Sequence, residues 1–134
     1  MTKLTKIEGI GETYAQQLRE AGIATLEALL EQGAAPRGRK EIAEKTGISD
    51  KLILKWINRA DLFRIKGVGE EYGDLLEVAG VDTVPELAQR NPENLYQKVI
   101  EVNEEKRLVR RPPTQEQIRG WIEQAKGLDR VVTY

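Results

Sequence analysis

The chain has 134 residues, 40% of them apolar and 32% charged, and its 21 Lys and Arg nearly balance its 22 Asp and Glu. It contains no cysteine and no histidine, which excludes disulfides, thiol nucleophiles, imidazole bases and the usual zinc ligands. A net charge of −1 does not suggest a dedicated nucleic-acid binder. No stretch approaches the roughly 18 apolar residues of a membrane span, and the start does not resemble a signal peptide.

These bounds predict a cytoplasmic protein that forms one compact domain or two closely packed small ones. With only 5 prolines, the chain can form helices around a largely aliphatic core. We expect no cofactor, no bound metal and no membrane contact. The sequence leaves the oligomeric state open.

The first patterned stretch, residues 7–11, reads apolar-x-Gly-apolar-Gly and recurs as residues 65–69. The match continues downstream at a constant offset of 58, with 10 identities in the 23 positions of residues 7–29. So many identities in so short a chain indicate a tandem duplication. We therefore expect a first unit at 1–64 and a second at 65–134.

In the first unit, helices are predicted at about 12–21, 25–30, 39–46 and 49–62. Gly22 and Gly47 are typical helix ends, while Thr25 and Ser49 are typical N-caps. Residues 33–38 are predicted to be a loop. The helix at about 49–62 leads directly into residues 65–69, so both units share it.

In the second unit, helices are predicted at about 70–79, from Thr83, at about 93–109 and from Thr114 onward. Thr83 and Thr114 begin capping boxes, and Pro112-Pro113 ends the third helix. The last helix of each unit has apolar residues at spacing i, i+3, i+4, i+7, which predicts a buried stripe. The two stripes lie 65 residues apart: Ile53, Trp56, Ile57, Ala60 and Ile118, Trp121, Ile122, Ala125. The second unit thus carries seven extra residues, both tryptophans should be buried, and Val131-Val132 should pack as an extended segment.

The two Gly-apolar-Gly turns have a physical role. Glycine permits backbone conformations that a Cβ forbids, and the N–H groups at the following helix start can hold a phosphate. The apolar residue between the glycines should plug into the core. These features give six candidate contacts for a nucleic-acid backbone: Gly9, Ile10, Gly11, Gly67, Val68 and Gly69.

At these residues the sequence resembles the helix-hairpin-helix family, with Ala15 and Gly73 as the small residue four positions after the second glycine. Over its whole length it looks like an uncharacterised bacterial family built of two such units. The resemblance implies an all-α fold of two tandem helix-hairpin-helix units packed into one compact, SAM-domain-like helical domain. It also implies that the hairpins contact phosphate. From glycine's conformational freedom we further expect that a side chain at Gly11 or Gly69 obstructs DNA and strains a turn that needs positive φ.

One departure from that family favours a purely structural role for the hairpins. DNA-binding members usually offer a lysine or arginine after the second glycine, whereas Glu12 and Glu70 stand there. A carboxylate suits the positive end of a helix but competes with phosphate for the same N–H groups.

Basic residues gather elsewhere. Residues 37–64 hold eight Lys or Arg against four Asp or Glu, and residues 106–111 add four more positive charges. Such clusters fit weak contact with a phosphate backbone, and a solvated face is the alternative interpretation. The candidate side chains are Arg37, Arg39, Lys40, Arg107, Arg110 and Arg111.

Residues 40–53 also resemble a helix-turn-helix, with the motif's spacing at Ala43, Gly47 and Ile53. Its recognition helix would offer five side chains to a major groove: Asp50, Lys51, Lys55, Asn58 and Arg59. Two short helices joined by a Thr-Gly turn also occur for packing alone.

No nucleophile–base pattern, P-loop or EF-hand spacing is present, so the sequence does not indicate an enzyme. Two function hypotheses follow. The first is weak, sequence-independent binding of double-stranded DNA through its phosphates. The second is a protein–protein scaffold whose hairpins only build the fold.

Overall fold

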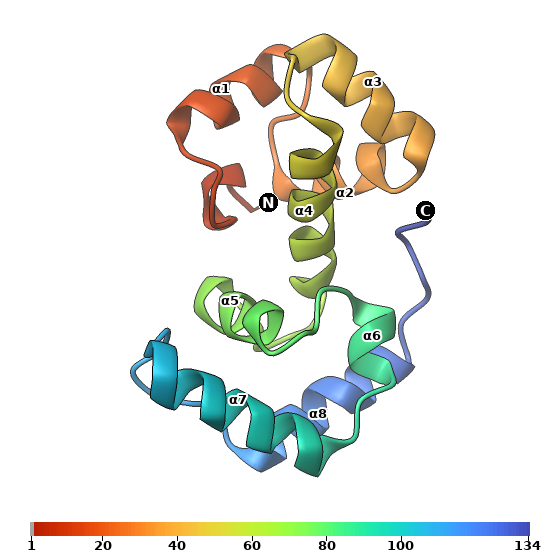
Figure 1. The fold of residues 1–134 in the computed structure, drawn as a ribbon. Coiled ribbons are helices and arrows are strands. Elements are labelled where there is room, and N and C mark those ends of the chain that lie inside the picture. The colour runs from red at the N-terminus through yellow and green to blue at the C-terminus, as the bar shows by residue number, and fades with distance from the viewer. Residues whose placement is uncertain (1) are drawn as a thin grey trace. The chain divides into compact units, whose positions relative to one another are not determined.

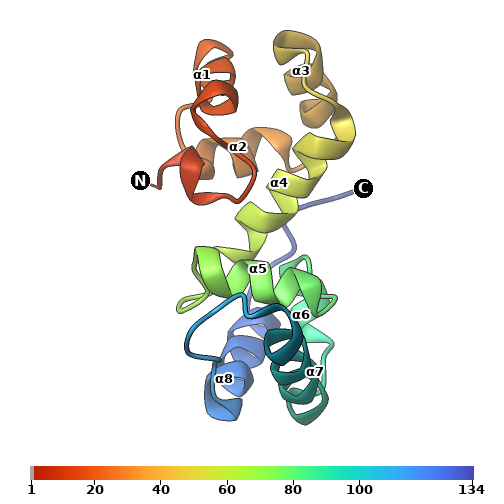
Figure 2. The same cartoon turned by 60° about the vertical axis from the view of Figure 1, so that its left-hand side comes forward.

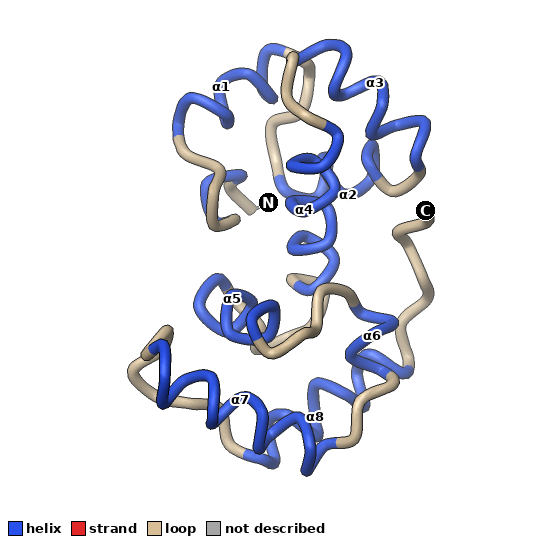
Figure 3. The backbone as a smooth tube through the Cα atoms, viewed as in Figure 1, coloured by secondary structure: helices blue, strands red, loops and turns tan. Residues whose placement is uncertain are grey.

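A computed structural model describes residues 2–134 of the chain, so residue 1 of the expected first unit lies outside the described part. Within these residues the fold is all-helical, with eight α-helices, one short 3-10 helix and no strand (Figures 1 and 3). The expected all-α fold class is confirmed. No helix in the described part is both long and apolar enough to cross a membrane.

The chain divides into two compact units. Unit 1 comprises Met1–Asp61 together with Val131–Tyr134, and unit 2 comprises Leu62–Arg130. The described elements of unit 1 are η1 (Leu4–Lys6), α1 (Glu12–Glu20), α2 (Leu26–Gly33), α3 (Pro36–Thr46) and α4 (Asp50–Leu62), whose last residue begins unit 2. Unit 2 continues with α5 (Glu70–Val78), α6 (Val84–Ala88), α7 (Pro92–Lys106) and α8 (Gln115–Lys126).

The helix boundaries of unit 1 follow local chemistry. Thr25 caps α2 by accepting a hydrogen bond from the N–H of Ala28 at 3.1 Å, and Gly22 adopts the left-handed conformation just after α1. The prediction of a loop through residue 38 was wrong, because α3 already begins at Pro36. Proline suits the first helical position, since its missing N–H would have no partner there.

Unit 2 follows the same rules with a longer third helix. Thr114 and Gln117 form the expected capping box of α8, with bonds of 3.1 and 2.8 Å. The third helix was predicted to reach residue 109, but α7 ends at Lys106 because Arg107 turns into the left-handed conformation. Beyond that turn, the side chain of Asn103 binds both the N–H and the carbonyl of Val109.

Equivalent backbone bonds recur in both units at the offset of 58. Ile23 N–H donates to the Leu18 carbonyl at 2.8 Å, and the Val81–Leu76 pair repeats this bond at 2.8 Å. Both tryptophans are buried as predicted, with exposed fractions of 1% for Trp56 and 4% for Trp121. The structure thus preserves the duplication seen in the sequence.

The C-terminal tail belongs to unit 1 and packs in an extended form, as predicted. Val132 is buried, and the N–H of Thr133 donates to the Ala34 carbonyl at 2.8 Å. The hydroxyl of Tyr134 donates to Oδ1 of Asn58 at 2.9 Å.

Candidate nucleic-acid interface

The two glycine turns have the same backbone geometry. Gly9 and Gly67 both have φ of 95°, and Ile10 and Val68 each donate their N–H to the carbonyl three residues earlier at 3.1 Å. The side chains of Ile10 and Val68 are buried, as expected of residues that plug the turn into the core. A ligand at these turns therefore cannot contact the side chains of Ile10 and Val68.

The second glycine of each turn is the N-cap of the next helix. Gly11 has φ of −86° and Gly69 has φ of −105°, so the expectation of a positive φ at these two positions was wrong. The positive φ belongs to the first glycine of each turn. A Cβ on Gly11 or Gly69 would meet no atom within 4 Å, which leaves the approach to either helix start open.

An aromatic pair supports each turn from inside its unit. Tyr14 contacts Trp56 with ring centroids 5.0 Å apart, and Tyr72 contacts Trp121 at 5.4 Å. A Cβ on Gly67 would lie 2.9 Å from Nε1 of Trp121. Trp56 and Trp121 lie in the core, so they are not stacking platforms for bases, whereas Tyr14 is exposed and Tyr72 is partly buried.

Carboxylates occupy the first turn of both following helices. Glu12 begins α1 and lies 3.6 Å from Arg19 in an exposed ion pair. Glu70 and Glu71 begin α5. Their negative charge satisfies the helix dipole and opposes a phosphate at the same place.

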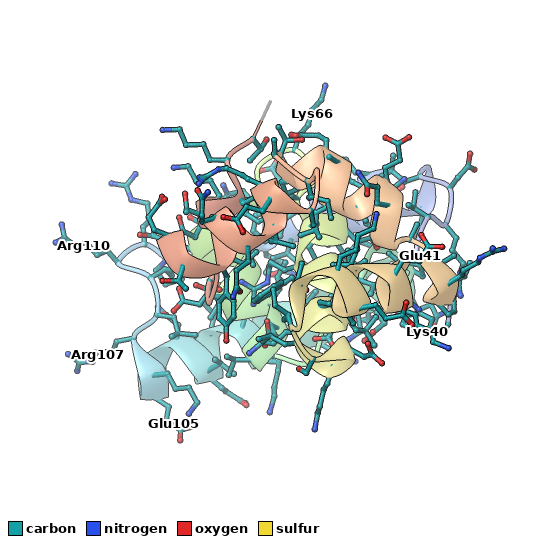
Figure 4. The ribbon with its side chains drawn as sticks, turned by 90° about the horizontal axis from the view of Figure 1, so that it is seen from above. Lys40, Glu41, Lys66, Glu105, Arg107 and Arg110 are labelled. Carbon is teal, nitrogen blue, oxygen red and sulfur yellow. The ribbon has the colours of Figure 1, made fainter. Side chains whose placement is uncertain are left out.

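The three candidate residues of the first basic cluster, Arg37, Arg39 and Lys40, lie in the first half of α3 and not at the first glycine turn. Figures 1 and 2 place the start of α3 and the start of α1 at different ends of unit 1. Arg37 is exposed, 3.7 Å from Glu41, and Lys40 projects outward from α3 in Figure 4.

Arg39 does not belong to this surface, because it is buried with an exposed fraction of 7%. Its guanidinium donates to the carbonyls of Gly33, Ala34 and Thr133 at 2.8, 3.0 and 2.7 Å. We therefore remove Arg39 from the candidate contacts and assign it to holding the C-terminal tail.

The second basic cluster, which we call the basic segment (residues 107–111), lies against the first turn of α5. The hydroxyl of Tyr72 donates to the Arg111 carbonyl at 2.9 Å. An open groove of about 820 Å³ runs between these elements. Its lining residues are Glu71, Asn103, Glu104, Arg107, Leu108, Val109, Arg110 and Pro112.

The guanidinium groups of the basic segment face solvent. Arg107, Arg110 and Arg111 are all exposed, and Figure 4 shows Arg107 and Arg110 extending outward from the end of α7 and the segment after it. Among the described residues, none pairs with these three side chains. The structure thus brings the segment that carries three of the predicted arginines next to the helix that follows the second turn.

The residues of the helix-turn-helix pattern form α3, a turn and α4. Part of the surface that α4 would offer to a major groove is turned inward. Gly47 is left-handed and Ile53 is buried. Arg59 is also buried, and Asn58 accepts the bond from Tyr134. Two of the five side chains proposed for a major groove are therefore engaged within unit 1.

The sequence reasoning missed Lys66, which is exposed in the second turn. Its backbone N–H and carbonyl are held by the side chain of Gln124 at 2.8 and 3.0 Å. Comparison of the two copies could have identified it, because the equivalent position in the first turn is Glu8, 58 residues earlier. The two turns therefore differ in charge.

Comparison with known proteins gives one family. The family model described as "Domain of unknown function (DUF4332)" matches residues 8–128. Neither a curated protein nor a solved structure matches the chain.

Proposed function

We propose that this chain, which belongs to the DUF4332 family, is a non-enzymatic helix-hairpin-helix protein that binds the phosphate backbone of double-stranded DNA. Binding is weak and does not read sequence. In this proposal each glycine turn is the hairpin of one helix-hairpin-helix unit. The cytoplasm is its expected location.

The observation that supports this proposal best is the position of the basic segment beside the second hairpin. The Tyr72–Arg111 hydrogen bond and the shared groove put the basic segment, with its three exposed arginines, beside the first turn of α5, whose N-cap is Gly69. Arginine forms paired hydrogen bonds with phosphate oxygens. Backbone N–H groups at a helix start add uncharged donors for the same ligand.

The charge of the protein explains why the binding should be weak. The net charge is −1, and Glu70, Glu71 and Glu104 lie near the basic segment. Few phosphates can therefore be neutralised, and counterion release supplies most of the free energy of non-specific binding.

A protein–protein scaffold is the second candidate function. It is favoured by the carboxylates that begin α1 and α5, because these already satisfy the helix dipoles without a ligand. In this interpretation the hairpins serve only to connect packed helices.

A fluorescence-anisotropy titration of unrelated duplexes of equal length tests the proposal. At about 50 mM salt we expect similar, saturable binding to every duplex, which weakens as salt rises. If no binding occurs at that salt concentration, the scaffold interpretation replaces the DNA proposal. A strong preference for one duplex would instead support the helix-turn-helix interpretation.

A further inference from the structure

We infer that the DNA site lies in unit 2 alone, and that unit 1 is a structural copy whose hairpin does not contact DNA. This inference rests on the proposed function and assigns it to one of the two copies. The ligand is the phosphodiester backbone of duplex DNA. The duplication makes the inference testable, because most positions of interest in unit 2 have a counterpart in unit 1.

The two units differ in length where the positive charge lies. α7 has 15 residues and α3 has 11, which adds about one helical turn, or roughly 6 Å. The connection to the next helix spans residues 107–114 in unit 2 and only residues 47–49 in unit 1. The basic segment is therefore part of the additional chain.

This additional chain changes what the third helix can reach. In unit 1, Lys45 and Thr46 at the end of α3 share a depression with Gln17 and Glu20, which lie in the second half of α1. In unit 2, the chain beyond α7 continues to the first turn of α5, where its arginines share a groove with Glu71. Only unit 2 therefore brings a basic cluster to the start of the helix that follows its hairpin.

The residues that follow α3 and α7, the third α-helices of their units, differ in backbone strain, which is greater in unit 2. α3 is followed by its C-cap Gly47, with φ of 75°. α7 is followed by its C-cap Arg107, with φ of 50° and ψ of 48°, the one non-glycine residue of positive φ in the described part of the chain. Glycine adopts this conformation without strain, so unit 2 carries an exposed arginine at a position where glycine would be the unstrained residue.

The basic segment also has a fixed backbone. Its first N–H bonds to the Asn103 carbonyl at 2.8 Å, the Asn103 side chain holds Val109 at 3.0 and 3.1 Å, and Tyr72 holds Arg111. The guanidinium groups thus project from an ordered support. A ligand that binds them does not have to order the backbone, which lowers the entropy cost of binding.

The first test removes two positive charges from either unit. We compare Arg107→Ala/Arg110→Ala with Arg37→Ala/Lys40→Ala by anisotropy titration over a range of salt. The unit 2 pair should weaken binding about tenfold or more at about 50 mM salt, and flatten the salt dependence by about 0.9 in log–log slope per lost phosphate contact. The unit 1 pair should leave both quantities unchanged.

The second test places one negative charge at either hairpin. Gly69→Asp and Gly11→Asp both add a carboxylate at an N-cap, where aspartate is favoured and space is available, so both variants should remain folded. Gly69→Asp should weaken binding severalfold, whereas Gly11→Asp should bind as the wild type does.

The third test removes a negative charge and predicts a gain. Glu104 lines the groove, and Glu44 is its counterpart, since each lies two residues before the end of its helix. Glu104→Gln should strengthen binding, and Glu44→Gln should not. Circular dichroism shows that each variant is folded before titration.

The outcomes separate this inference from the proposed function. If the wild type binds and the variants of the two units weaken binding equally, both units contribute and the inference is overturned while the function stands. A larger loss in the unit 1 variants would also overturn it. If the wild type does not bind, the function itself fails and the inference fails with it.

Discussion

At the residue scale, the two glycines of each Gly-apolar-Gly turn are required for different reasons. Gly67 adopts a positive φ and faces Trp121, whereas Gly69 has an ordinary extended backbone with open space around it. A side chain at Gly67 therefore meets both conformational strain and a steric clash. At Gly69 the absence of a side chain matters only for what approaches from outside.

We predict that Gly67→Ser lowers the free energy of unfolding by about 2 kcal/mol or more, through the left-handed backbone and the contact with Trp121. Gly69→Ser should be neutral or stabilise by a few tenths of a kcal/mol, because serine is a good N-cap. Urea unfolding followed by tryptophan fluorescence measures both. Equal destabilisation by the two variants would contradict the assignment of strain to the first glycine.

Arg39 and its neighbour Lys40 give a second contrast between a buried and an exposed cation. We predict that Arg39→Ala lowers the free energy of unfolding by about 2–3 kcal/mol, because carbonyls of unit 1 lose a charged donor. Lys40→Ala should change it by less than about 0.5 kcal/mol. Thermal or urea unfolding measures the difference, and an unaffected Arg39→Ala protein would exclude the structural role given to this guanidinium.

At the scale of elements, the end of α7 combines a stability cost with a proposed function. We predict that Arg107→Gly raises the free energy of unfolding by about 0.5–1 kcal/mol, since glycine relieves the left-handed strain. The same variant should weaken DNA binding. Parallel unfolding and anisotropy measurements test the trade-off, with Arg110→Gly as a control that loses the same charge. A gain in stability without a loss of binding would show that Arg107 does not contact DNA.

The C-terminal tail is the second element whose role can be tested. We predict that a chain stopped after Arg130 is less stable by about 2 kcal/mol, because it loses the burial of Val132 and the backbone bond to Ala34. Arg39→Ala should lower the free energy of unfolding less in the shortened chain than in the full chain. The shortened chain already lacks the Thr133 carbonyl, which is one of the acceptors of Arg39. Full additivity of the two changes in a double-mutant cycle would show that Arg39 and the tail do not act together.

At the scale of the whole molecule, charge balance limits any electrostatic ligand. We predict dissociation constants of micromolar or weaker at physiological salt, as is typical of non-specific binding, with no dependence on duplex sequence. Anisotropy titrations of several unrelated duplexes at about 50 and 150 mM salt measure this. A nanomolar affinity at the higher salt would require more phosphate contacts than the basic segment offers.

Much of the fold could be predicted because its signals are local. The signals are hydrophobic spacing, Thr and Ser caps and glycine stops, which act within one or two turns of a helix. The helices and the burial of Trp56 and Trp121 could therefore be predicted from the residue pattern. The errors occurred at two helix boundaries. Pro36 begins α3 through a local signal that the sequence already contained, whereas α7 stops at Lys106 because Arg107 is left-handed. A left-handed arginine leaves no compositional signal.

The candidate site could be predicted less well, because the burial of a basic side chain depends on residues far away in the sequence. Arg39 and Arg37 are equivalent in composition, yet Arg39 is buried by bonds to carbonyls that include Thr133, 94 residues away. The adjacency of the basic segment to α5 likewise depends on the Tyr72–Arg111 contact, which joins residues 39 apart. Neither contact follows from local spacing.

The duplication, the all-helical class and the apolar plug of both glycine turns could be predicted, since each is encoded by spacing within one copy or by identity between copies. Tertiary packing sets which basic residues are exposed, which glycine of each turn carries the positive φ, and which glycine turn lies near an arginine cluster. Those properties depend on how segments far apart in the chain pack together. Burial and charge proximity are set by that packing, and helical periodicity does not record it.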